Sequence, residues 1–322
     1  MAGLFYRDSN IYRNNGIQRR LTMSPAPTNA VFSGSCTALV TPFKDGKLDK
    51  DAFCKLVDWQ IENGTAALIP VGTTGESPTL SHEEHDIVVD LCIKQAAGSV
   101  PVIAGAGSNS TAEAVRLARH AADAGADAVL IVSPYYNKPT QQGLYQHFGA
   151  VAAAVDVPVI VYDIPGRSIV RVNDDTLARL AKDFSNIQGI KDATADGARP
   201  TILRNLLGPD FAQLSGEDGT ALPYLAAGGH GCISVTANIA PKQLSEMHAA
   251  WAAGDIATAQ AINARMMPVH EAMFCEASPG PVKYAAELLG ICSADTRLPL
   301  CEIDPQSKAQ VKAALISAGL LK

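Results

Sequence analysis

Three short apolar segments decide the fold: AVLIV at 128–132, VPVIVY at 157–162 and IQGIK at 187–191. Each is nearly continuous in aliphatic residues, which is typical of a strand buried on both faces of a parallel sheet. Helical patterns follow the strands, as the crossover between two parallel strands requires. This part of the chain therefore predicts consecutive β-α units.

The same alternation extends in both directions. Five further strands are predicted at 36–40, 67–71, 101–104, 211–214 and 231–235. Asp49 is a predicted helix N-cap, Ser81 and Glu84 form a predicted capping box, and Ser110 with Glu113 is expected to open another capped helix. Eight strand–helix units predict a closed (β/α)8 barrel, the TIM-barrel architecture of the α/β class. A doubly wound open sheet is the alternative.

The chain divides into three predicted regions. Residues 1–31 hold four arginines and no sustained period, so we expect a flexible N-terminal arm, an upstream start with the true start at Met23, or a mitochondrial-type presequence. Residues 32–240 form the predicted barrel. Residues 241–322 are predicted to be wholly helical, as a C-terminal appendage that is too short for an independent globule.

Composition excludes several classes of protein. Hydrophobic residues make up 47% of the 322 residues, which argues against a disordered chain, and no apolar run is long enough for a membrane span. The net charge of −6 argues against a nucleic-acid partner. The seven cysteines have no metal-ligand or C-x-x-C spacing, so we expect buried thiols in a reducing, cytoplasmic compartment and no metal.

Barrel chemistry is found at the carboxyl ends of the strands, and this rule selects a few candidate residues. Lys191 ends an apolar strand, where a neutral amine could form a Schiff base, or where a structural lysine could pair with Asp192. Tyr162, one strand away, could transfer protons or be an ordinary rim residue. Thr73 and Arg167 could bind carboxylates, or serve only as turn and surface residues.

His82 and His85 share the first turn of a predicted helix, beside two glutamates. Their spacing could hold a metal, but a helix N-terminus repels cations, so a carboxylate-binding or capping role is favoured.

Three motifs together resemble those of the dihydrodipicolinate synthase family. They are GTTGE at 72–76, Tyr162 with the turn Pro165-x-Arg167, and GIKDAT at 189–194. The likeness runs from about residue 34 to 321 and places the chain near the pyruvate-dependent class I aldolases, which include N-acetylneuraminate lyase. It implies condensation of pyruvate with L-aspartate-4-semialdehyde to 4-hydroxy-tetrahydrodipicolinate, in lysine and diaminopimelate synthesis.

The resemblance also implies individual catalytic roles. Lys191 would form the imine with pyruvate, so that no separate cofactor is needed. Tyr162 would be the general acid and base. Thr73 would connect Tyr162 to Tyr136, which would come from the neighbouring subunit of a tight dimer within a homotetramer.

Substrate binding is implied for three further positions. Thr74 would hold the pyruvate carboxylate, Arg167 the semialdehyde carboxylate, and the Ile233 carbonyl would help to position the lysine. Asp163 and Glu217 depart from the usual Asn and Asp of the family, which puts substrate detail in doubt. The alternatives are an aldolase acting on N-acetylneuraminate or a 2-keto-3-deoxy sugar acid, and a catalytically silent regulator that binds a metabolite.

Many members of the family bind L-lysine as an inhibitor at the tight-dimer interface. The resemblance extends this expectation to a set of polar residues around the helix that begins near residue 82. These are Ser77, His82, His85, Asn109, Glu113 and Tyr135. The alternative is an unused crevice in which the histidines and the glutamate only cap helices.

Overall fold

The computed structural model describes residues 30–322, so most of the predicted arm lies outside the described part. Eight parallel strands form one sheet in the order β4-β1-β10-β9-β8-β7-β6-β5. They are β1 (Gly34–Ala38), β4 (Ala67–Ile69), β5 (Ile103–Gly105), β6 (Ala128–Val132), β7 (Val159–Asp163), β8 (Ile187–Asp192), β9 (Ala212–Ser215) and β10 (Gly231–Ser234). A parallel bridge between Leu68 and Val102 joins the two ends of the sheet. The predicted (β/α)8 barrel is confirmed.

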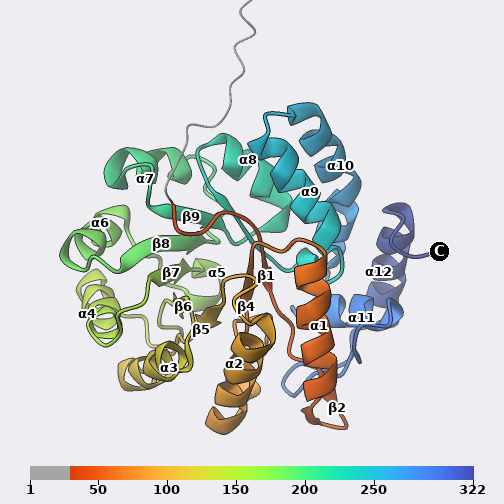
Figure 1. The fold of residues 1–322 in the computed structure, drawn as a ribbon, viewed down its shortest axis with the longest axis horizontal. Coiled ribbons are helices and arrows are strands. Elements are labelled where there is room, and N and C mark those ends of the chain that lie inside the picture. Colours follow the sequence, from red (N-terminus) through yellow and green to blue (C-terminus); the bar gives the residue numbers. More distant parts are fainter. Residues whose placement is uncertain (1–29) are drawn as a thin grey trace, which may run out of the picture.

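Helices surround the strands on the outside of the barrel (Figure 1). The surrounding helices are α1 (Lys50–Glu62), α2 (His82–Ala96), α3 (Thr111–Ala124), α4 (Gln141–Ala152), α6 (Asp174–Asp183), α7 (Arg199–Leu207), α8 (Ala221–Ala226) and α9 (Pro241–Ala252). The chain then continues through α10 (Ile256–Ala272), α11 (Gly280–Leu288) and α12 (Pro305–Ser317). Residues 241–322 hold four helices, α9 to α12, and α9 packs against β1. The region is not wholly helical as predicted, because residues 289–304 between α11 and α12 form an irregular loop. The boundary at residue 240 stays a prediction.

Short elements complete the loops. They are the hairpin β2 (Phe43–Lys44) and β3 (Lys47–Leu48), the helix α5 (Pro165–Ser168), and the 3-10 turns η1 (Ser77–Thr79), η2 (Asp218–Thr220) and η3 (Thr236–Asn238). Of these, α5 and η1 matter most for the site, because α5 follows the end of β7 and η1 lies in the loop after β4.

Two of the three predicted helix caps are confirmed together with their hydrogen bonds. Asp49 accepts a hydrogen bond from the Ala52 N–H at 3.0 Å, and Ser81 and Glu84 form the reciprocal capping box. Ser110 is the N-cap residue of α3 as predicted, but its side chain makes no capping hydrogen bond. The Glu113 carboxylate instead interacts with His82 at the start of α2 and with Ser108 in the loop after β5. It therefore connects α3 to neighbouring segments and does not cap its own helix.

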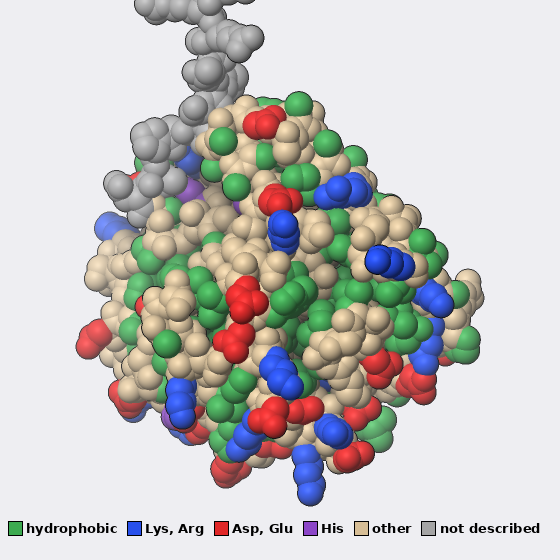
Figure 2. Space-filling model, turned by 45° about the vertical axis from the view of Figure 1, so that its right-hand side comes forward, with side chains coloured by type: hydrophobic (Ala, Val, Ile, Leu, Met, Phe, Trp, Pro, Cys, Tyr) green, Lys and Arg blue, Asp and Glu red, His purple; other side chains and the backbone are tan. Residues whose placement is uncertain are grey.

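The apolar core has two layers, as expected for strands buried on both faces. Inside the barrel, small and aliphatic side chains pack with Phe32 and Tyr162, whereas a larger cluster lies between the strands and the helices. No helix among residues 30–322 is long and apolar enough to cross a membrane. Acidic and basic side chains are interspersed on the face shown in Figure 2, which fits the small net charge of −6.

Candidate active site

Lys191 and Tyr162 lie side by side at the carboxyl ends of β8 and β7. The two residues are register partners, and the Lys191 Nζ lies 4.2 Å from the centroid of the Tyr162 ring. Each residue is only 5% exposed. The predicted amine and phenol are therefore brought together in the barrel mouth, where a proton donor can serve chemistry at the amine.

A cavity of about 240 Å³ opens beside Tyr162. Five predicted site residues line it: Thr73, Ser77, Tyr135, Tyr162 and Arg167. Leu130, Val132 and Ile164 supply apolar walls. A small apolar pocket with a few convergent polar groups is the usual form of a small-molecule site.

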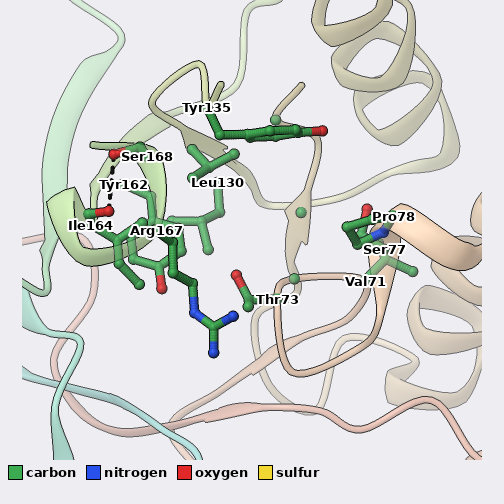
Figure 3. Close-up of a pocket in the computed structure, with 14 residues that line it drawn as sticks. Val71, Thr73, Ser77, Pro78, Leu130, Tyr135, Tyr162, Ile164, Arg167 and Ser168 are labelled. Atoms are coloured by element: carbon green, nitrogen blue, oxygen red, sulfur yellow. Dashed lines mark hydrogen bonds between the residues drawn. The ribbon is translucent and has the colours of Figure 1, made fainter. Parts of the chain in front are cut away.

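Figure 3 shows how these side chains are arranged. The hydroxyl of Thr73 and the guanidinium of Arg167 point into the same space, next to Tyr162. Arg167 lies in α5, whose turn is closed by a hydrogen bond of 2.9 Å from the Ser168 hydroxyl to the Ile164 carbonyl. This arrangement places an exposed cation above a buried phenol, as recognition of a carboxylate would require.

Four residues predicted for catalysis or substrate binding do not line this cavity. Lys191, Thr74 and Ile233 are buried, at 5%, 3% and 0% exposure. Tyr136 is 85% exposed and has a φ of 73°, so its ring leaves the barrel mouth of its own chain. Its predicted role in a neighbouring subunit stays a prediction.

Glu217 adds a carboxyl group to the barrel mouth. Burial and the neighbouring Asp218 raise its pKa, while the positive charges of Lys191 and Arg167 act in the opposite direction. Asp218 accepts hydrogen bonds from the N–H groups of Val235 (2.9 Å) and Thr236 (3.1 Å). Asp218 thus connects the loop after β9 with the end of β10. No group of three or more His, Cys, Asp or Glu within residues 30–322 could hold a metal ion.

Some of the residues predicted to bind lysine are joined by hydrogen bonds, and two others, Ser77 and Tyr135, line the cavity. The Nε2 atom of His82 lies 2.7 Å from the Glu113 carboxylate, which also accepts a hydrogen bond from the Ser108 hydroxyl. These two hydrogen bonds, Ser108 first, lower the pKa of Glu113. Burial and the charge of Glu113 raise the pKa of Tyr135.

Two members of the predicted lysine set have other partners. His85 is 3% exposed, and its Nε2 lies 3.0 Å from the Gly105 carbonyl oxygen, so it braces β5. Burial lowers its pKa. Asn109 contributes its carbonyl to a hydrogen bond of 2.8 Å from the Asn137 side chain. Their contact with an effector stays a prediction.

Arg199 is a buried residue at the site that the sequence did not point out. Its Nη1 donates to Asp163 at 2.7 Å and to Asp192 at 3.3 Å, and its side chain is fully buried. These aspartates directly follow Tyr162 and Lys191 in the sequence. Two aspartates at neighbouring strand ends, with an arginine opening the next helix, are the signal that could have identified this cluster.

A closed (β/α)8 barrel with a buried lysine beside a tyrosine at adjacent strand ends defines a lyase of the class I aldolase type. The family comparison makes this specific, since the dihydrodipicolinate synthetase family matches residues 31–318. The chain belongs to this family.

Individual relatives agree with this assignment. The 4-hydroxy-tetrahydrodipicolinate synthase of Bradyrhizobium diazoefficiens is 56% identical over 90% of this chain and 98% of its own length. The pyruvate complex of the Acinetobacter baumannii dihydrodipicolinate synthase is 47% identical over 90% of this chain and 100% of its own, with a TM-score of 0.87. The Cyanidioschyzon merolae enzyme with lysine bound is 40% identical over 91% and 100%, with a TM-score of 0.88.

Proposed function

We propose that the chain condenses pyruvate with L-aspartate-4-semialdehyde to 4-hydroxy-tetrahydrodipicolinate, a step of lysine and diaminopimelate biosynthesis. The observation that carries this proposal is the Lys191 amine, 4.2 Å from the Tyr162 ring at the barrel mouth. The printed names of the relatives, and the pyruvate bound to the Acinetobacter baumannii enzyme, support the same activity.

The first half of the reaction uses the lysine. The Lys191 Nζ attacks the ketone carbon of pyruvate, water leaves, and an imine forms between the two. Loss of a methyl proton converts the imine to an enamine, whose carbon attacks the aldehyde of the second substrate. The amino group of that substrate then displaces Lys191 and closes the ring. No separate cofactor enters these steps.

Tyr162 and Thr73 would move protons during these steps, together with Tyr136 from a neighbouring subunit of a homotetramer built as a dimer of dimers. Thr74 would hold the pyruvate carboxylate, and the Ile233 carbonyl would help to orient the lysine. We place the enzyme in the cytoplasm, where its reduced cysteines would be stable.

Arg167 favours the semialdehyde over a sugar acid. Its exposed guanidinium reaches over the cavity beside Thr73 (Figure 3) and can bind a carboxylate through two parallel hydrogen bonds. Turnover with L-aspartate-4-semialdehyde, compared with N-acetylneuraminate and a 2-keto-3-deoxy sugar acid, separates the two activities. Faster turnover of a sugar acid would overturn the proposal.

Replacing Lys191 with Ala tests the imine. Borohydride reduction in the presence of pyruvate should attach a covalent adduct to Lys191 of the unchanged chain and to no residue of the variant. Peptide mapping by mass spectrometry locates the adduct, and circular dichroism confirms that the variant is folded. An adduct of normal yield on another lysine, or no adduct on the unchanged chain, would refute the mechanism.

A further inference from the structure

A buried ion pair joins the C-terminal helical region to the loop after β4. Lys283 of α11 and Glu76 are 0% and 2% exposed, and the Lys283 Nζ donates to Glu76 Oε1 at 2.7 Å. The same ammonium donates to the Thr41 carbonyl at 2.9 Å and lies over the Phe43 ring. A charge pair without water contact persists only when its hydrogen bonds are satisfied, as they are here.

The second oxygen of Glu76 also has a partner from the C-terminal region. Glu76 Oε2 accepts a hydrogen bond from the Arg297 N–H at 3.1 Å. The Arg297 guanidinium continues to the Glu84 carboxylate through two hydrogen bonds of 2.6 Å and to the Thr79 carbonyl at 2.9 Å. Two cationic residues outside the strands of the barrel thus hold both ends of the segment 76–84.

This anchoring acts directly on the turn that walls the cavity. Glu76 has a φ of 55°, a left-handed conformation that costs free energy for a residue with a Cβ. Its N–H donates to the Thr73 carbonyl at 3.1 Å, and the Thr41 hydroxyl donates to the Gly75 carbonyl at 2.7 Å. Holding Glu76 therefore fixes the turn that presents Thr73 and Thr74.

We propose that Lys283 and Glu76 are positioning residues that hold the Thr73–Thr74 turn in the shape that binds the pyruvate carboxylate. This inference rests on the proposed function, because it assigns the turn to pyruvate. The C-terminal region thereby affects substrate binding indirectly, through the turn, although it contributes no residue to the cavity lining.

The expected signature is a change in pyruvate affinity rather than in chemistry at Lys191. A turn freed from Glu76 samples other shapes, so pyruvate must select the binding-competent one. We expect the KM for pyruvate to rise about tenfold in Lys283→Met and Glu76→Gln. The kcat at saturating pyruvate should change less than threefold, since bound pyruvate selects the shape of the turn in which Thr73 also takes part in proton transfer. The Lys191–Tyr162 pair lies on other strands and is not disturbed.

Two further variants separate positioning from stability. The double variant Glu76→Gln/Lys283→Met removes both charges, so no unpaired charge remains in the interior and the thermal stability should partly recover. Its KM for pyruvate should stay raised, because the hydrogen bonds to Thr41 and Glu76 are still lost. Lys308→Met, which removes an ion pair with the exposed Glu302, is the matched control in the same region and should leave the KM unchanged.

The measurements are steady-state kinetics, half-saturation of borohydride trapping by pyruvate, and thermal melting of the same samples. A KM and half-saturation within twofold of the unchanged chain in all folded variants would overturn the inference. Recovery of the KM together with stability in the double variant would do so too. If the unchanged chain traps no pyruvate, the proposed function itself fails; if it traps pyruvate and the variants do so equally well, only the positioning role fails.

Discussion

Single buried charged residues hold neighbouring groups in place through hydrogen bonds in this barrel. Asp163 is 0% exposed, and both of its carboxylate oxygens accept hydrogen bonds: Oδ1 from the Val172 N–H at 3.1 Å and Oδ2 from Arg199 at 2.7 Å. Burial raises its pKa, and the charge of Arg199 opposes this change. A side chain with two accepting oxygens therefore satisfies both donors at this position.

Replacing Asp163 with Asn should destabilise the chain. The amide offers one acceptor and one NH2 group, so either the Val172 N–H or Arg199 loses its partner, and Arg199 is left with less compensating charge. We expect a loss of about 2–4 kcal/mol in the free energy of unfolding. Urea denaturation measures it. Asp174→Asn, which alters a partly exposed partner of Arg199, is the control and should cost less; an equal or smaller loss for Asp163→Asn would contradict the account.

Some of these residues could be predicted from the sequence and others could not. Lys191 and Tyr162 could, because each ends an apolar strand and such ends meet at one face of a barrel. Lys283 could not, because its partner Glu76 is 207 positions away and a lysine in a helix is normally solvated. Only the fold brings these two charges together.

Helices and strands could be predicted from the sequence where their local hydrophobic pattern was strong. β6 and β7 are apolar over most of their length, and all eight barrel strands lie within a few residues of their predicted bounds. The hairpin of β2 and β3 was missed, since two strands of two residues carry no period. Ser110 is the N-cap of α3 as predicted, but the expected capping hydrogen bonds are absent, and the Glu113 carboxylate has partners on α2 and in the loop after β5 that the local pattern cannot reveal.

The contact between α2 and α3 yields a prediction about regulation. The carboxylate of Glu113 can pair with a ligand ammonium near Tyr135, which borders the cavity that also contains Tyr162. L-lysine should therefore inhibit turnover without simple competition with pyruvate. Glu113→Ala should weaken this inhibition at least tenfold, the factor expected for a lost charged hydrogen bond of about 1.4 kcal/mol or more.

The measurement is turnover at several pyruvate and lysine concentrations, with calorimetric titration of lysine. Glu83→Ala, which removes an exposed carboxylate from the same turn as His82, is the matched control and should leave inhibition intact. Full activity in millimolar lysine together with no heat of binding would remove the proposal.

At the scale of the whole molecule, several histidines outside the cavity are buried, and their burial favours the neutral ring. Burial lowers the pKa of His147 in α4 and of His248 in α9 to about 4, and also lowers that of His270 in α10. The unfolded chain would protonate these rings near pH 6.5. Between pH 6.5 and pH 4 the unfolded state therefore binds more protons, so stability falls as the pH falls.

His147 tests this dependence. A pKa lowered from 6.5 to about 4 makes a contribution of about 3 kcal/mol that is fully present above pH 6.5 and lost as the pH falls to 4. His147→Asn should lower the free energy of unfolding at neutral pH and reduce its further loss on acidification, because one titrating ring is gone. Urea denaturation from pH 4.5 to 7.5 measures both. Thr111→Val, which removes the hydrogen-bond partner of the His147 Nδ1 but keeps the ring, should retain the pH dependence, and an unchanged pH dependence in His147→Asn would show that the ring is not buried neutral.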